Sequence, residues 1–388
     1  MRQILAVVGT RSEMVRLAPV IRRLKDEGGR EVGVRWVHAD DHAGQIWQTA
    51  AVFGLSSDGE VLSGHRPSNL LEHSWALTNA ISKEMECRMP DLLLVQGESL
   101  PAMLAAQQAF MRRVPVIYLV ASSHNGLRDS RGPQTSYRKL LTAISTFQCV
   151  TNEADLMQLR AQGVPVFEIG ITGDTVVDAI DTVTKYGVLN GSEAACDPGN
   201  GLAATRILVP LGSTARWVGS LTDFALAIAD LAQSASSHEF TIVLEPDAVC
   251  RDLITAILGS TPNVTLRDPM QYSEFLRLMQ QQDLVLADGL DYYDEAVALR
   301  KPMLLAQDRA SDEHLAPPAG LTLIGSRREQ IVQAVLDSRR ANGQVKRQPL
   351  RMYSLGDGHA ASRISRLIMN WSRNQILTPR AFEPYRSC

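Results

Sequence analysis

The sequence predicts an α/β protein with two domains, each built on a parallel β-sheet that is covered by helices. Three observations predict this fold class: the length of the chain, an alternation of short apolar runs with amphipathic segments, and one break in that alternation. A chain of 388 residues is too long for a single hydrophobic core and suits two domains. Short apolar runs that alternate with amphipathic helices are typical of parallel sheets with helices on both faces.

The first half of the chain shows this alternation from its first residues. In chain order, the predicted elements are the strand ILAVV (4–8), a helix over about 13–27, the strand 32–39, helices over about 43–53 and 68–88, the strand 91–97, the helix 100–113 and the strand 114–120. The order predicts one parallel sheet for this half.

A polar, Gly-rich stretch at 188–206 interrupts the alternation, which then restarts with RILVPLG (206–212). We predict a first Rossmann-like domain over 1–180, a linker region over 181–205, a second Rossmann-like domain over 206–357, and a final helix within 358–388 that packs back toward the first domain. Open parallel sheets bind ligands at the carboxyl ends of their strands. We therefore expect both sheets to face a central cleft.

Composition and charge exclude several classes of protein. The chain is 45% hydrophobic and 21% charged, which is normal for a globular protein, and its net charge of −3 argues against a broad nucleic-acid surface. No apolar run reaches the roughly 20 residues that span a bilayer, and we expect no signal peptide. The five cysteines form no CxxC pair, so we expect no zinc site and a cytoplasmic location.

The loop GTRSE (9–13) joins the first strand to the first helix. Arg11 can hold an anionic ligand there, because a guanidinium grips phosphate with a forked pair of donors and a helix start adds amide donors. The alternative is a helix-start arginine that pairs with Glu13. The loop lacks a GxGxxG pattern, so a nicotinamide cofactor is not expected. Near the other end, GDGHAA (356–361) predicts a turn with an N-cap for the final helix.

Eight segments together resemble the UDP-N-acetylglucosamine 2-epimerases, whose fold is of the GT-B type. The segments are GTRSE (9–13), DLLLVQGES (91–99), PQTSYR (133–138), ITGDTVVDAI (171–180), DPMQYSEF (268–275), LVLADGLDYYDEA (284–296), RKPMLL (300–305) and LGDGHAASRI (355–364). They are similar to the family's GTRPE, DVVLVHGDT, PEEANR, ITGNTVIDAL, DPQEYLPF, LILTDSGGIQEEA, GKPVLV and YGDGQACSRI. The resemblance covers nearly the whole chain and keeps the order of the segments.

The resemblance implies a UDP-sugar bound between the two domains. In this family the sugar C2 proton is removed, UDP is eliminated and then re-added, while hydrolysing relatives release the free 2-epimer. The resemblance places nucleotide and substrate contacts at Arg11, Glu13, Arg138, Phe275, Asp288 and Glu295. Glu98 falls on the family's catalytic aspartate, and His42 falls on the histidine of its QHREM stretch. No metal or other cofactor is implied.

Several family positions have changed. Val120 stands where the family has a catalytic glutamate, Gln134 replaces the first glutamate of PEE, and Gly212 falls on the histidine of GHRRE. Leu290 and Asp291 replace the two glycines of DSGG, which adds a side chain and a negative charge where phosphate is held. Losing one acid or base typically costs about 10²–10⁴-fold in rate. We therefore expect 2-epimerase chemistry that is altered or lost.

His124 falls on an arginine of the family's EAGLRT stretch. It is either a relocated acid or base or an ordinary loop histidine. Three functions stay open: an epimerase-family enzyme with altered chemistry, a silent nucleotide-sugar-binding partner of an active paralogue, and a GT-B-type glycosyltransferase or nucleotide-sugar hydrolase. Because the family dimerises through its first domain, we expect a homodimer or a heteromer.

Overall fold

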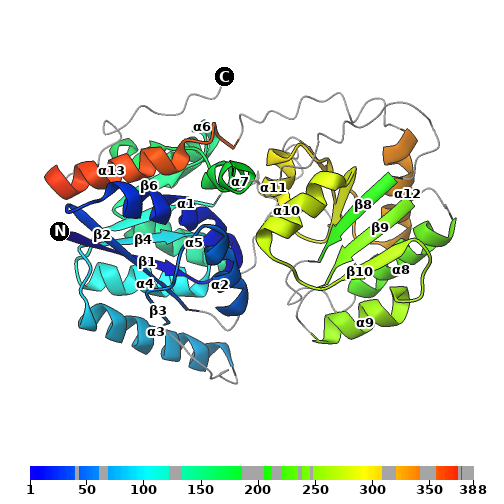
Figure 1. Cartoon of the computed structure of the whole chain (residues 1–388), viewed down its shortest axis with the longest axis horizontal. Coiled ribbons are helices and arrows are strands. Elements are labelled where there is room, and N and C mark those ends of the chain that lie inside the picture. Colours follow the sequence, from blue (N-terminus) through cyan, green and yellow to red (C-terminus); the bar gives the residue numbers. More distant parts are fainter. Residues whose placement is uncertain are drawn as a thin grey trace. The chain divides into compact units, whose positions relative to one another are not determined.

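The computed structural model describes residues 1–39, 43–60, 69–121, 133–185, 205–211, 220–234, 238–244, 248–307, 320–340, 355–374 and 377. These residues form two compact α/β units (Figure 1). The first unit contains the described residues of 1–121, 133–185 and 355–374, and the second contains those of 205–340. The fold class expected from the sequence, two parallel-sheet α/β units, is confirmed.

The first unit is built on a seven-stranded parallel sheet with the order β3-β2-β1-β4-β5-β6-β7. Its strands are β1 (Arg2–Val8), β2 (Val32–His38), β3 (Gly59–Glu60), β4 (Leu92–Gln96), β5 (Val116–Leu119), β6 (Phe147–Val150) and β7 (Ile169–Ile171). Its helices are α1 (Arg11–Glu27), α2 (Ala43–Val52), α3 (Leu70–Cys87), α4 (Leu100–Met111), α5 (Pro133–Ile144), α6 (Glu153–Ala161), α7 (Thr175–Lys185) and α13 (Ala360–Asn374), with a 3₁₀ turn at Val166–Glu168.

Strand β1 lies at the centre of this sheet and is buried on both faces from Ile4 to Val8. It pairs with β2 on one side, where Val8 lies opposite His38, and with β4 on the other. The strand order reverses between β1 and β4, and such a switch point opens a crevice at the carboxyl ends of the strands. The loops after β1 and β4 therefore lie next to each other.

The second unit is built on a six-stranded parallel sheet with the order β10-β9-β8-β11-β12-β13. Its strands are β8 (Thr205–Pro210), β9 (His238–Val243), β10 (Val264–Arg267), β11 (Leu284–Ala287), β12 (Met303–Leu305) and β13 (Leu321–Leu323). Its helices are α8 (Ser220–Ser234), α9 (Ala248–Leu258), α10 (Tyr272–Gln281), α11 (Tyr293–Ala298) and α12 (Arg328–Arg340). Here the order reverses between β8 and β11.

Helix α7 ends at Lys185, five residues beyond the boundary at 180 that the sequence suggested. The extra turn belongs to the first unit because Val183 is buried in its core. Among the described residues, no helix is long and apolar enough to cross a membrane. No cluster of three or more His, Cys, Asp or Glu side chains that could hold a metal occurs in the same residues.

Helix α13 packs on α1 and α7 of the first unit, although the second unit precedes it in the chain (Figure 1). Its apolar face is buried, from Ile364 to Trp371. At its start, the Asp178 carboxylate of α7 accepts hydrogen bonds from the amides of Ala360 (3.2 Å) and Ala361 (3.0 Å). The cap of this helix therefore comes from a residue far away in the sequence.

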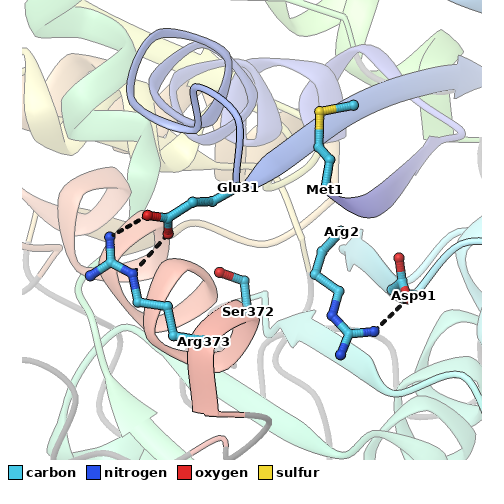
Figure 2. A pocket seen from close by; sticks show the side chains of 6 residues that line it. All are labelled: Met1, Arg2, Glu31, Asp91, Ser372 and Arg373. Atoms are coloured by element: carbon cyan, nitrogen blue, oxygen red, sulfur yellow. Dashed lines mark hydrogen bonds and ion pairs between the residues drawn. The ribbon is translucent and has the colours of Figure 1, made fainter.

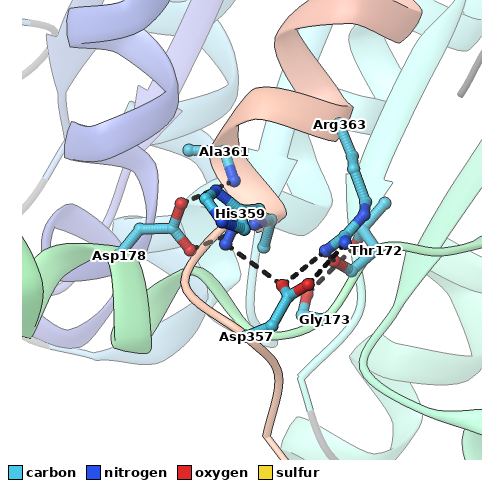
Figure 3. A network of polar contacts seen from close by, with 8 residues as sticks. Thr172, Gly173, Asp178, Asp357, His359, Ala361 and Arg363 are labelled. Atoms are coloured by element: carbon cyan, nitrogen blue, oxygen red, sulfur yellow. Dashed lines mark hydrogen bonds and ion pairs between the residues drawn. The ribbon is translucent and has the colours of Figure 1, made fainter. Parts of the chain in front are cut away.

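The GDGH turn before α13 is held by a second carboxylate, as Figure 3 shows. Asp357 accepts from the His359 amide at 3.2 Å and from both terminal nitrogens of Arg363, at 2.7 and 2.6 Å. Arg363 also donates to the Thr172 carbonyl at 3.1 Å. The aspartate in the GDGHAA segment thus closes the turn, whereas the first helical amides are capped by Asp178.

Asp178 gives the first unit a stability that depends on pH. Burial raises the pKa of its carboxyl to about 7, against the lowering effect of the two amide bonds. Folding therefore takes up a proton between about pH 4, where an unfolded aspartate titrates, and pH 7. The stabilisation is complete below this window and is lost as the pH rises through it, by up to about 4 kcal/mol in the free energy of unfolding.

Urea unfolding at several values between pH 4 and 8 measures this effect. We expect the free energy of unfolding of wild type to fall relative to that of Asp178→Asn as the pH rises, because asparagine does not ionise. Taking the difference removes the contribution of other buried carboxyls. A difference that stays constant across the window would contradict the assignment.

Candidate functional site

The GTRSE loop after β1 is held by its own glutamate. Thr10 is the N-cap of α1 and accepts from the Glu13 amide at 3.2 Å. The Glu13 carboxylate in turn accepts from the amides of Gly9 (2.7 Å) and Thr10 (3.2 Å), which completes a capping box. Arg11 is the first residue of the helix and is partly exposed. The loop thus presents Arg11 at a helix N-terminus, where an anion is favoured.

Glu13 also reaches the neighbouring loop after β4. Its carboxyl is buried and is hydrogen-bonded to Ser99 as well as to Gly9 and Thr10. Burial raises the pKa of this carboxyl to about 7, although the hydrogen bonds act in the opposite direction. The contact is close, because a Cβ on Gly97 would lie 2.8 Å from a Glu13 carboxylate oxygen. This geometry gives Glu13 a role in holding the two loops together.

Glu98 and Arg138 form a buried ion pair at the same edge of the sheet. An Arg138 terminal nitrogen lies 3.3 Å from Glu98 Oε1, and the two side chains are 10% and 3% exposed. The Nε and the other terminal nitrogen of Arg138 are buried and have no hydrogen-bond partner within the part of the chain that the structure describes. A guanidinium held by one carboxylate keeps donors for a further polar group.

Two neighbouring positions carry no ionisable group. Val120, at the end of β5, is buried in the apolar core, and its amide donates to the Cys149 carbonyl at 2.9 Å. Gln134 lies in the first turn of α5 and is exposed. Neither side chain can exchange a proton with a substrate. Of the three positions Glu98, Val120 and Gln134, only Glu98 carries a carboxylate.

In the second unit, the predicted nucleotide residues gather at the end of β11 and on the two helices α10 and α11. Phe275 on α10 is almost fully buried and stacks on Tyr292, with the ring centroids 4.6 Å apart. Asp288 follows β11 directly and is buried. Glu295, on α11, is buried as well. Tyr292 is the more exposed ring of the pair and was not singled out from the sequence.

The segment after β11 differs from a flexible glycine loop. The Leu290 carbonyl accepts from the Tyr293 amide at 3.1 Å, which makes a turn at the start of α11. Asp291 is exposed, and its carboxylate lies 3.3 Å from where a Cβ on Gly289 would be. Asp294 is buried beside Tyr293, and burial together with this aspartate raises the pKa of the Tyr293 phenol. The turn is therefore acidic, which disfavours a diphosphate placed against it.

Three of the predicted positions, His42, His124 and Gly212, lie outside the described residues. The structure adds His38, which ends β2 beside the GTRSE loop and is fully buried. Its Nε2 accepts from the Trp47 indole at 2.6 Å, so the proton of the neutral ring is on Nδ1. A histidine next to the last position of the predicted strand 32–39 was the sequence signal that could have identified it.

A separate cavity of about 370 Å³ lies in the first unit, near the start of β1. Figure 2 shows the side chains that line it. It is lined by Met1, Arg2, Glu31, Asp91, Ser372 and Arg373. Arg2 pairs with Asp91 at 2.9 Å, and Arg373 pairs with Glu31 at 2.8 Å. The charges of these two pairs compensate one another. None of the residues that line the cavity belongs to the candidate site.

Comparison of the sequence with curated proteins finds UDP-N-acetylglucosamine 2-epimerases. Relatives include the probable UDP-N-acetylglucosamine 2-epimerase of Ralstonia nicotianae, 24% identical over 378 residues (95% of this chain, 99% of the relative). The UDP-N-acetylglucosamine 2-epimerase of Escherichia coli K12 is 25% identical over 372 residues (95% and 98%).

Solved structures with the same fold include the UDP-GlcNAc 2-epimerase of Neisseria meningitidis bound to UDP-GlcNAc. It has a TM-score of 0.82 at 22% identity and covers 95% of this chain and 100% of its own. The S. aureus MnaA–UDP co-structure has a TM-score of 0.83 at 18% identity (97% and 98%). The family model described as UDP-N-acetylglucosamine 2-epimerase matches residues 31–369. The chain therefore belongs to the UDP-N-acetylglucosamine 2-epimerase family.

Proposed function

We propose that this protein binds UDP-N-acetylglucosamine or a closely related nucleotide sugar, and that its 2-epimerase chemistry is altered. Membership of the family and the similar structures that contain UDP-GlcNAc or UDP support the binding. The proposal of altered chemistry is supported by the residues at the carboxyl edge of the first sheet. Glu98 and Arg138 form a buried pair there, while Val120 and Gln134 supply no acid or base.

Each unit contributes different chemistry to this proposal. In the first unit, Arg11 and the amides at the start of α1 bind the diphosphate. Glu98 is the group placed to exchange a proton with the sugar, and the remaining donors of Arg138 orient a polar substituent of the sugar. In the second unit, the stacked rings of Phe275 and Tyr292 support the base, and Glu295 accepts from the ribose hydroxyls.

A second candidate is a binding protein without turnover that acts beside an active paralogue. The absence of an acid or base at Val120 and Gln134 favours this candidate. Epimerisation requires a proton to leave one face of the sugar C2 and to return on the other face. A single carboxylate at Glu98 can serve one face only.

Proton NMR of the purified protein with UDP-GlcNAc in D₂O tests the proposal and separates the two candidates. We expect broadened ligand resonances, which report binding, together with slow exchange of the sugar H2. Glu98→Gln should remove the exchange and keep the broadening. Broadening without exchange would favour the silent binding protein. Ligand resonances that stay sharp at millimolar protein would overturn the proposal.

A further inference from the structure

The structure joins the two loops of the first unit's candidate site through one buried side chain. The Glu13 carboxyl is bonded to the amides of Gly9 and Thr10 in the loop that presents Arg11, and to Ser99 in the loop that presents Glu98. Thr10 and Ser99 are themselves the N-caps of α1 and α4. One carboxyl thus holds the starts of two helices together.

The two loops are packed so closely that neither Gly9 nor Gly97 could carry a side chain without a shift of its neighbours. A Cβ on Gly9 would lie 2.5 Å from the Ser99 hydroxyl oxygen, and a Cβ on Gly97 would lie 2.8 Å from Glu13 Oε1. Gly97 also has a φ of +83°, which favours glycine. A shift of Glu13 would therefore move both loops, and with them Arg11 and Glu98.

We propose that Glu13 is a positioning residue that locks the Arg11 loop to the Glu98 loop and takes up a proton when an anionic ligand binds beside Arg11. The inference rests on the proposed nucleotide binding. Among the described residues, the other ionisable groups at this edge include Arg11 in the same loop, Glu98 with its partner Arg138, and His38 at the end of β2.

Charge explains the proton uptake. An ionised Glu13 places a negative charge at the N-terminus of α1, where a diphosphate would be bound, and like charges repel. A proton on Oε1 removes that repulsion and leaves Oε2 to accept from the amides of Gly9 and Thr10. Because the pKa of Glu13 is raised to about 7, both forms are populated near neutral pH. By linkage, a diphosphate then binds more tightly at pH 6 than at pH 8.

Titration calorimetry with UDP, in buffers of different ionisation enthalpy between pH 6 and 8, tests the inference. We expect wild type to take up a fraction of a proton more than Glu13→Gln at pH 7. Glutamine mimics the protonated acid, so this variant should keep the affinity that wild type has at pH 6 and show less pH dependence. Glu13→Ala removes the link between the loops and should weaken UDP binding roughly tenfold at every pH.

Asp178→Asn is the matched control. Asp178 is also buried, its pKa is also raised to about 7, and it also accepts from helix-start amides, but it caps α13. We expect this variant to keep the UDP affinity and the UDP-linked proton uptake of wild type. Wild-type affinity in Glu13→Ala, or wild-type proton uptake in Glu13→Gln, would overturn the inference.

If wild type binds no UDP, the proposed nucleotide binding fails and the positioning role is still measurable. Amide hydrogen exchange of the ligand-free protein reports it. Glu13→Ala should speed exchange in the segments around Gly9 and around Ser99 together, whereas Asp178→Asn should speed neither. Faster exchange in only one of the two segments would overturn the positioning role.

Discussion

Replacing Arg11 by alanine is expected to weaken the binding of UDP by roughly 10–100-fold, the usual loss for a charge-assisted contact of about 1.5–3 kcal/mol. Arg11 begins α1 and is partly exposed, on a loop whose shape is fixed by the Thr10–Glu13 capping box. The substitution removes the guanidinium and keeps the capping box. The free energy of unfolding should therefore change little.

Titration calorimetry with UDP measures the effect of Arg11→Ala. Arg23→Ala is the control, because Arg23 is in the same helix and pairs with Glu27 at the surface. Arg23→Ala should bind UDP as wild type does. Equal affinity in both variants would show that the diphosphate is bound elsewhere, and Arg11 would then be only a helix-start residue.

Replacing Arg16 by methionine is expected to lower the free energy of unfolding by about 3–5 kcal/mol, the usual cost of removing one partner from a buried ion pair. Arg16 on α1 lies 3.3 Å from an Asp174 carboxylate oxygen, and the two side chains are 8% and 5% exposed. Arg16 also donates to the Ser12 hydroxyl at 2.7 Å. Methionine fills much of the same volume but leaves a buried carboxylate without its cation.

Urea unfolding measures the loss, and two further variants show its origin. The double variant Arg16→Met/Asp174→Asn should recover part of it, since the buried charge is gone. Arg373→Met breaks a pair whose side chains are 56% and 48% exposed, so it should cost less than about 1 kcal/mol. Similar losses for Arg16→Met and Arg373→Met would mean that burial of the Arg16–Asp174 pair has no energetic importance.

The sequence predicted the parts of the fold that depend on local pattern. The apolar run at 4–8 and the amphipathic segment after it determine β1 and α1, because strand and helix periodicities act over a few residues. Glu13 was assigned to the ligand through the family resemblance alone. The spacing Thr10-x-x-Glu13 is also a capping-box signature, and the structure contains this capping box.

Other features depend on contacts between distant segments and could not be predicted. A final helix within 358–388 was expected, but nothing near it in the sequence indicates that Asp178 caps its first turn. Likewise, the pairing of Glu98 with Arg138 joins two residues 40 positions apart. The partial stacking of Tyr292 on Phe275 requires the positions of two helices. Sequence patterns identify such residues one by one and do not show which of them meet.

The placement of α13 has a consequence for how the protein is made. During synthesis, residues 1–185 leave the ribosome first, yet the faces of α1 and α7 that α13 covers stay open until residue 374 has emerged. The second unit, which lies in between, can complete its own sheet before that moment. The unit that begins first is therefore the one that finishes last, and a nascent chain halted after residue 340 would carry an incomplete first unit beside a complete second one.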